Sequence, residues 1–422
     1  MTPPASRGDR LSPRRMELAL SDRALILLLA PLTALGTMAQ NMFVPVLPVL
    51  QAELHVSVAA ANTTGSAALL AYAIGLLFGG MISDRLGRRP VMLTGALVFL
   101  LGSISCALAP SLGWLVAARV VQALGSSTCM VTSRAIIGDV YPRESMARML
   151  AFLTMLMVVA PTFSPMIGGF IGNSLGWRGV FWVLAIVSVP VLAFTWARLP
   201  ETRTTEARAA FSGLAGSSLA TLWHQTRQVL WDHAFLTGIV QASVIYSTFL
   251  VFVWTVPYVL RTQHLPLSTY GHWYLCIAIG YVAGNFLVTR LGSRHSMPTL
   301  IRTGLLLQTS GALAAFALAE AGIAGPLLTP LCLFLPMGLL AFGQGLALPN
   351  ITASAIARHP EASGTASSLM GFLQQFAAAM AVQWIGLFPA DTPKPMMRFV
   401  FCSALFSLAM LGFSRPAHNA RR

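Results

Sequence analysis

The sequence predicts an all-α membrane protein with twelve transmembrane helices arranged as two pseudo-symmetric six-helix bundles. Of its 422 residues, 56% are hydrophobic and only 9% are charged, and its mean hydropathy is +0.71. Soluble domains carry about 25% charged residues, so this composition disfavours a soluble enzyme. The apolar content also excludes intrinsic disorder. The apolar residues occur in long runs, whereas a membrane barrel would show short alternating segments.

Each predicted helix rests on one apolar run. A bilayer core about 30 Å thick requires about 20 apolar residues per helix. On that basis we expect spans at residues 24–49, 62–82, 91–109, 113–137, 147–172, 179–197, 234–260, 269–289, 299–319, 326–348, 364–388 and 397–414. The residues before the first span are rich in Arg and Pro and carry no cleavage-site pattern, which indicates a tail and not a signal peptide.

Basic residues are distributed unevenly between the two sides of these spans. With the N-terminus inside the cell, 22 of the 27 Lys and Arg lie in cytoplasmic segments and 4 lie in outer segments. Arg119 alone lies well inside a span. The positive-inside rule therefore predicts a multi-pass protein of the cell inner membrane with cytoplasmic N- and C-termini. Membrane orientation explains the net charge of +14, so we expect contacts with membrane lipids and no nucleic-acid partner. We also expect the protein to be a monomer.

A long polar segment divides the spans into two sets of six. The expected units are a cytoplasmic tail at 1–22, a bundle at 23–198, a cytoplasmic loop at 199–232, a bundle at 233–414 and a second tail at 415–422. The segments Gly79–Arg89 and Gly284–Arg294 align at a constant offset of 205 residues. Each joins the second and third helices of its half. Two homologous halves are typical of a transporter that rocks around a central site.

The connection between the second and third helices is rich in glycine and charge. Its candidate gating residues are Gly80, Asp84, Arg85, Gly87, Arg88 and Arg89. Gly87 permits a tight turn. We expect Arg88 to pair with Asp139 at the end of the fourth helix, and Asp84 to cap a helix end in the opposite half. Such a latch breaks when the inner gate opens, as a two-state element must; a static topology anchor is the alternative.

This connection resembles motif A of the major facilitator superfamily. Arg119-Val-Val-Gln-Ala-Leu-Gly125 resembles its motif B, and Ala160-Pro-Thr-Phe-Ser-Pro-Met-Ile-Gly-Gly169 resembles the antiporter motif of the fifth helix. Together with Leu199-Pro-Glu-Thr202, these segments are similar to the Bcr/CflA group of drug-resistance efflux transporters. The resemblance implies the major facilitator fold, alternating access, and export of bicyclomycin- or chloramphenicol-like compounds in exchange for protons.

The fifth helix carries four further gating candidates. Pro161 and Pro165 remove backbone donors and bend the helix, while Gly168 and Gly169 let it pack closely on a neighbour. The resemblance implies that this segment seals one side of the transporter. Chemistry alone indicates only a kinked and tightly packed helix.

In the superfamily, helices 1, 4, 7 and 10 line the central cavity, and here each carries polar or aromatic residues. The candidate substrate-binding residues are Thr37, Gln40, Asn41, Phe43, Arg119, Gln122, Ser126, Tyr246, Trp254, Tyr258 and Gln344. On the fourth helix the polar residues share one face, and polar side chains facing lipid are costly. Each assignment has an alternative. A single polar residue could instead pack between helices, and an aromatic residue could pack in the core or anchor the helix at the membrane interface. Arg119 could instead snorkel to the surface.

The expected cavity lacks a carboxylate. Asn41 occupies the position at which the group usually has an acid, and all 13 acids lie in tails, loops or helix ends. Arg119 would then favour neutral or anionic small-molecule substrates. A proton carrier needs a pKa near the working pH, and the substitutes on offer are Asp84, Asp139, Glu320 and His272.

Two other functions stay open: a dedicated exporter of an endogenous metabolite such as a siderophore, and a receptor-like membrane protein that does not transport. An enzyme is disfavoured, because the sequence has no nucleophile–base pair, no HExxH and no phosphate-binding glycine loop. The five cysteines have no CxxC spacing, so neither a metal site, a cofactor nor a disulfide is expected.

Overall fold

The computed structural model describes residues 22–141, 143–202, 226–291, 294–322, 327–359 and 363–412. Within these ranges the chain forms helices joined by short connections, and no strand. Both predicted tails, except Asp22, and most of the predicted loop at 199–232 lie outside the described residues, as does the side chain of Pro161.

The N-terminal half contains the first six predicted spans. The first span is interrupted near Pro45, where a 3-10 turn separates two helices. The fifth and sixth spans form one continuous element that breaks only at Gly176, whose φ is 69°. The elements of this half are α2 (Asp22–Phe43), η1 (Val44–Val46), α3 (Leu47–Glu53), α4 (Val58–Leu86), α5 (Arg88–Ala107), α6 (Leu112–Val140) and α7 (Arg143–Arg198).

The C-terminal half contains the other six spans. Its elements are α10 (His233–Thr262), α11 (Leu267–Leu291), α12 (Met297–Glu320), α13 (Leu328–Ile356), α14 (Ser363–Ile385), α15 (Lys394–Ala409) and η3 (Met410–Gly412). The twelve predicted spans are therefore all helical. Most helices extend a few residues beyond the apolar run, because a helix continues into the membrane interface, where polar residues are tolerated.

Ten stretches of the described residues are long and apolar enough to cross a membrane by length and composition. The helix α14 is not among them, and α7 contributes only residues 162–198. Gln374, Gln375 and Gln383 lower the hydropathy of α14, yet the helix packs between α4 and α10. A helix covered on two sides by protein can carry such amides without exposing them to lipid.

Close glycine contacts repeat in the two halves. In the N-terminal half Gly75 and Gly79 of α4 pack on α6, and in the C-terminal half Gly280 and Gly284 of α11 pack on α13. The same holds for Gly95 and Gly102 of α5 against α6, and for Gly304 and Gly311 of α12 against α13. A Cβ added at Gly102 would lie 2.7 Å from Cα of Gln122, and one at Gly311 would lie 2.6 Å from the carbonyl oxygen of Pro336. The predicted internal repeat is thus a repeat of helix packing.

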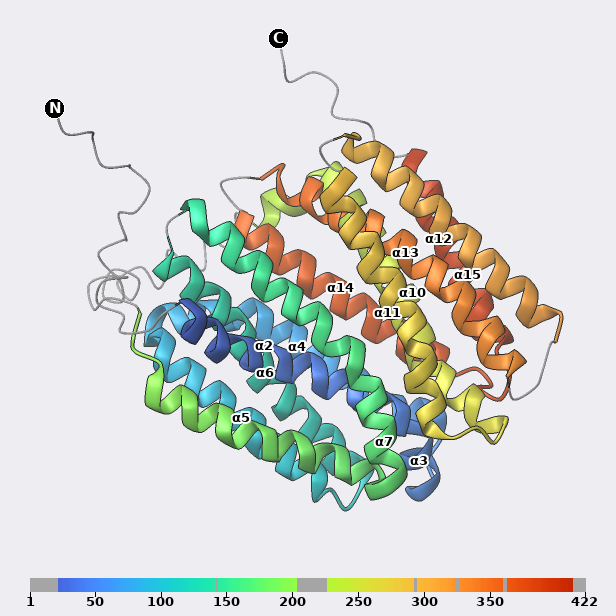
Figure 1. Ribbon diagram of the computed structural model, residues 1–422, viewed down its shortest axis with the longest axis horizontal. Helices are drawn as coiled ribbons and strands as arrows, with labels where there is room; N and C mark the ends of the chain where they lie inside the picture. The colour runs from blue at the N-terminus through green and yellow to red at the C-terminus, as the bar shows by residue number, and fades with distance from the viewer. Residues whose placement is uncertain are drawn as a thin grey trace, which may run out of the picture.

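The two halves lie side by side (Figure 1), with α4 packed on α14 and α7 packed on α11. The helices run between two ends of the molecule. We call the end that holds Arg88 and Asp139 the latch end, and the end that holds the turns 54–57 and 263–266 the far end. Residues at a helix terminus therefore belong to one end, and mid-helix residues lie between them.

Candidate functional site

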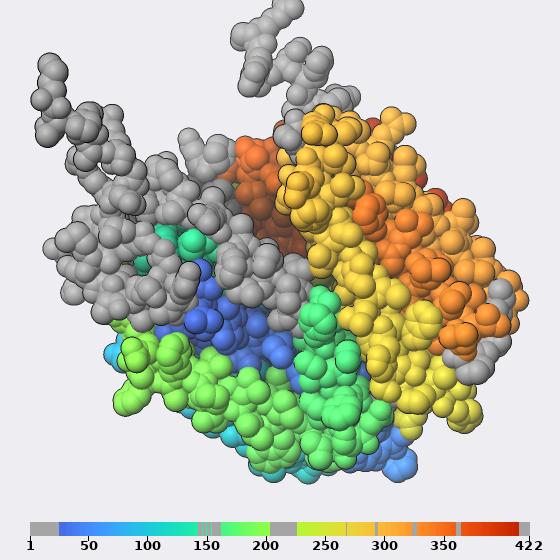
Figure 2. All heavy atoms as spheres, in the orientation of Figure 1, coloured from blue at the N-terminus to red at the C-terminus, as the bar shows by residue number. Residues whose placement is uncertain are grey.

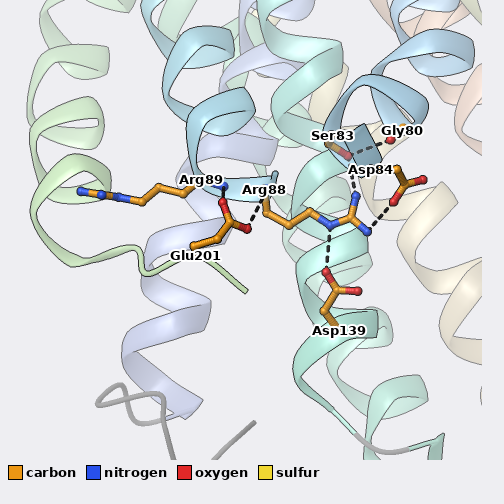
Figure 3. A network of polar contacts seen from close by, with 7 residues as sticks. All are labelled: Gly80, Ser83, Asp84, Arg88, Arg89, Asp139 and Glu201. Carbon is orange, nitrogen blue, oxygen red and sulfur yellow. Dashed lines mark hydrogen bonds and ion pairs between the residues drawn. The ribbon is translucent and has the colours of Figure 1, made fainter. Parts of the chain in front are cut away.

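At the latch end Arg88 binds three side chains (Figure 3). Its Nε lies 2.8 Å from Oδ2 of Asp139, its Nη2 lies 2.8 Å from Oδ1 of Asp84, and its Nη1 donates to Oγ of Ser83 at 2.6 Å. The Arg88 side chain is 5% exposed, against 29% for Asp84. The fork of the guanidinium suits this arrangement, since it donates in several directions from one rigid plane. The structure thus forms the predicted pair of Arg88 with Asp139.

The helix α5 begins directly after a tight turn at Gly87, whose φ of 103° suits glycine alone. Glu201, at the end of the described part of α7's connection, closes this turn (Figure 3). It accepts from the backbone N–H of Arg88 at 2.9 Å and of Arg89 at 3.2 Å. A carboxylate at a helix N-terminus satisfies free donors and complements the helix dipole. Our sequence reasoning did not assign this cap, although Glu201 lies in a motif that it singled out.

The second predicted role of Asp84 was a cap on a helix of the opposite half. In the structure Asp84 forms an ion pair with Arg88, four residues later. The chain just before α14, at 360–362, lies outside the described residues. The cap therefore stays a prediction.

At the far end the two halves are joined by direct contacts. The hydroxyl of Tyr258 donates to Oδ1 of Asn62 at 3.4 Å, and Nδ2 of Asn62 donates to the carbonyl of Val382 at 3.4 Å. Arg261 donates to the carbonyl of Pro48. The ring of Trp254 lies against Gly65, where an added Cβ would be 1.8 Å from two ring carbons. Asn62 and Gly65 belong to α4, so the predicted binding residues Trp254 and Tyr258 lie in the seal between the halves.

The helix α7 supports this seal from the other side. A Cβ at Gly168 would lie 2.0 Å from the carbonyl oxygen of Met42 in α2, and one at Gly271 of α11 would lie 2.4 Å from Cα of Met166 in α7. Pro165 is buried beside them. The close packing predicted for this segment is present, and through Gly271 it extends across to the C-terminal half.

Arg119 is enclosed within the N-terminal half. It is 1% exposed, so snorkelling to the surface does not describe it. One amino group of its guanidinium donates to Oε1 of Gln122 at 2.7 Å and to the carbonyl of Ala39 at 3.3 Å. The rings of Phe43 and Phe181 lie 4.9 and 5.7 Å from its central carbon. Its Nε and Nη2 are buried without a hydrogen-bond partner, so cation–π contacts stabilise much of this charge.

The other predicted cavity residues fall into two groups. Gln122 donates to Ser103 of α5, and Gln344 donates to the carbonyl of Ile245; with Ser126, these side chains are buried between helices of one half. The second group is half-buried and consists of Thr37, Gln40, Asn41 and Tyr246. Asn41 donates to the carbonyl of Thr37 on its own helix. The half-buried group is the one that leaves side-chain surface for a substrate, and its role stays a prediction.

Tyr72 of α4 is a central residue that our sequence reasoning missed. Its ring lies beside Gly36 of α2, and its hydroxyl donates to the sulfur of Met130 of α6 at 2.5 Å. The available signal was a single tyrosine in an otherwise Ala- and Gly-rich stretch. Figure 2 shows the surface hollowed where α14 lies behind α11, on the latch-end side of the contact between the halves.

No group of three or more His, Cys, Asp or Glu that could hold a metal is found among the described residues. The five cysteines, all within described ranges, are free.

Comparison with known proteins decides the family. The sequence pattern of the Major Facilitator Superfamily matches residues 29–382. The chain belongs to the Major Facilitator Superfamily. This is a family of transporters and not of enzymes. The superfamily resemblance inferred from the loop between α4 and α5 is confirmed.

Curated relatives of this major facilitator protein match nearly its whole length. The uncharacterized MFS-type transporter YdgK of Bacillus subtilis is 28% identical over 396 residues, covering 93% of this chain and 96% of the relative. Multidrug resistance protein D of Escherichia coli is 28% identical over 86% of this chain and 89% of its own. A chloramphenicol resistance protein of Pseudomonas aeruginosa is 26% identical over 93% and 90%. These names agree with the drug-efflux group that the motifs resemble.

Solved structures show the same fold. A bacterial homolog of the human lysosomal transporter Spinster, in an inward-facing and unoccupied conformation, is 18% identical with a TM-score of 0.70, covering 96% of each chain. A D-xylose–proton symporter is 16% identical with a TM-score of 0.72, covering 91% of this chain and 97% of its own. At these identities the likeness concerns the fold alone.

Proposed function

We propose that this chain exports small amphiphilic compounds, neutral or anionic and including chloramphenicol-like drugs, from the cytoplasm across the cell inner membrane. The two halves, 23–198 and 233–414, rock about a central site in alternating access. The observation that carries the proposal is the arrangement of two equivalently packed halves that are sealed together at the far end, while the ion-pair latch at the other end lies within the N-terminal half. The names of the relatives supply the substrate class.

Orientation follows from charge. The latch end carries most of the arginines, so the positive-inside rule places it in the cytoplasm with both termini. The far-end seal is then the outer gate, closed in this state. Loss of the Tyr258–Asn62 and Trp254–Gly65 contacts would open the protein to the outside. The protein acts as a monomer within the lipid.

Protons are the proposed coupling ion. Every acid with a described side chain lies at a helix end or beside one, and Asp84 and Asp139 are those held by the latch. Protonation of either carboxylate would remove one partner of Arg88 and weaken the latch. A switching element that responds to protonation is what exchange of drug for proton requires.

The test is drug accumulation in cells. Cells lacking their own drug pumps and expressing this chain are expected to accumulate less chloramphenicol than cells carrying the empty vector. Arg88→Gln should abolish the difference, while Arg302→Gln, at an exposed position of α12, should preserve it. In inverted vesicles uptake should fall when the pH gradient is collapsed. Equal accumulation with and without the chain would reject drug export, and uptake insensitive to the gradient would reject proton exchange.

A further inference from the structure

The helix α6 carries a second arginine that the latch does not use. Arg134 lies six residues before the end of α6 at Val140, which is about 9 Å inward along the axis at 1.5 Å per residue. It is exposed, unlike Arg119 on the same helix. Among the described residues no hydrogen bond or ion pair to Arg134 is found. A guanidinium at this depth therefore has no acceptor among the residues whose side chains the structure describes.

The face of α6 on which Arg134 lies points into the molecule. At 100° per residue Arg134 is rotated by about 80° from Leu124 and about 140° from Val121, two apolar residues exposed on the outside of the helix. It lies one turn after Met130, on the same side of the helix. Met130 accepts from Tyr72, so this face is turned toward Tyr72.

The groups around Arg134 suit an anionic ligand. Tyr72 donates to the sulfur of Met130, one turn before Arg134 on the same helix. Phenol groups donate hydrogen bonds and offer apolar ring faces, but at neutral pH they supply no negative charge. Asp139, the nearest acid along the chain, and Asp84 are both bound to Arg88 at the helix end. The described residues therefore offer Arg134 no acceptor, and a ligand could supply one.

We propose that Arg134 recognises an anionic group of the transported compound, of the size of a carboxylate, and so sets specificity. This rests on the proposed export function. Arg119 is already enclosed by protein, whereas Arg134 is exposed near the latch end. If that end closed over an unpaired guanidinium, the charge would lose its hydrating water and gain no hydrogen bonds in return. A bound carboxylate supplies charge-assisted hydrogen bonds in its place. The loaded cavity then closes more readily than the empty one.

The experiment compares matched ligands on the purified full-length protein. Chloramphenicol and chloramphenicol succinate share a scaffold and differ by a carboxylate. Arg134→Gln should weaken binding of the succinate by about 10-fold or more, the value of a charge-assisted hydrogen bond, and leave chloramphenicol binding unchanged. Arg134→Lys should restore part of the loss, because it keeps the charge but not the fork. Arg302→Gln is the control and should change neither.

A second pair separates failure of this inference from failure of drug export. Benzoate and benzamide have nearly the same shape and differ in charge, and their binding is followed by the shift in thermal unfolding. Benzoate should stabilise the wild-type protein and lose that effect in Arg134→Gln. If chloramphenicol is neither bound nor exported but the benzoate result holds, the drug class is wrong and Arg134 is still an anion site. Equal effects of Arg134→Gln on both members of each pair, or no preference for the anions in the wild type, would overturn the inference.

Discussion

The seal at the far end can be tested by adding a single methyl group. In Gly65→Ala the new Cβ would lie 1.8 Å from two ring carbons of Trp254 and 2.9 Å from a third. Trp254 is 1% exposed, so its ring has no free space to enter, and the clash is relieved most simply by moving the two halves apart. Overpacking of this kind costs about 1–3 kcal/mol, which shifts the equilibrium toward the outward-open state by about 5- to 150-fold.

The assay is the distance between spin labels across the far end. Labels at Ala52→Cys and Gln263→Cys, both exposed, report on opposite halves in a background whose native cysteines are replaced. Gly65→Ala should lengthen this distance, and adding Trp254→Ala should restore it by removing the ring.

Two controls keep the result interpretable. At Gly113 an added Cβ meets nothing within 4 Å, so Gly113→Ala should leave the distance unchanged. At Gly125 the Cβ would lie 2.5 Å from the backbone nitrogen of Phe99 in the same half, so Gly125→Ala should lower thermal stability without separating the halves. An unchanged distance in Gly65→Ala, or lengthening in Gly125→Ala to the same extent, would refute the assignment of Trp254 to the seal.

The remaining predictions concern the latch end. Arg88→Gln should lower the free energy of unfolding by about 2 kcal/mol, below the 3–5 kcal/mol of a fully buried pair because its two acids are partly exposed. The double variant with Asp139→Asn should lose less than the sum of the two single losses, and additive losses in denaturant titrations would contradict the pairing. Glu201→Gln should cost about 1 kcal/mol by weakening the cap on α5, and an unchanged unfolding midpoint would show that the cap is dispensable. Burial alone would raise the pKa of Asp232, but the hydrogen bonds from Arg358 and from a backbone N–H, together with the charge of Arg358, outweigh it and hold the pKa below its ordinary value. This contribution to stability is therefore complete above the unfolded pKa of about 3.9 and is lost as the pH falls through the lower folded pKa, so Arg358→Gln should destabilise at pH 7 and much less at pH 3; an equal effect at both values would reject the ion pair.

The helical spans and the latch pair were predictable because each depends on residues that lie close together in the sequence or at predictable helix ends. A run of about 20 apolar residues forms a helix in a membrane almost independently of its neighbours. Gly87 and the charges around it define a turn at the interface, and Asp139 is placed at the same end by the lengths of two helices. The break between the fifth and sixth spans was also placed correctly, since Gly176 lies between their predicted boundaries.

The candidate site was less predictable. Helical spacing shows which residues share one face of a helix, but it does not show which helix or cavity that face contacts. Arg119, Gln122 and Ser126 do share one side of α6, but that side packs against α2 and α5 of the same half. Arg134 was counted with the basic residues of the cytoplasmic side, since charge rules register only its proximity to a helix end. Its inward direction depends on how α6 is rotated against α4.

By itself, therefore, the sequence determined the number and position of the spans, their expected orientation and the superfamily, because hydropathy and turn chemistry act through the backbone and its immediate solvent. The tertiary structure alone decided which polar groups are enclosed and which stay open. Trp254 came to lie on Gly65 and Phe181 on Arg119 through contacts between helices more than 60 residues apart. Such contacts depend on helix rotation and close approach, and neither is encoded in a single apolar run.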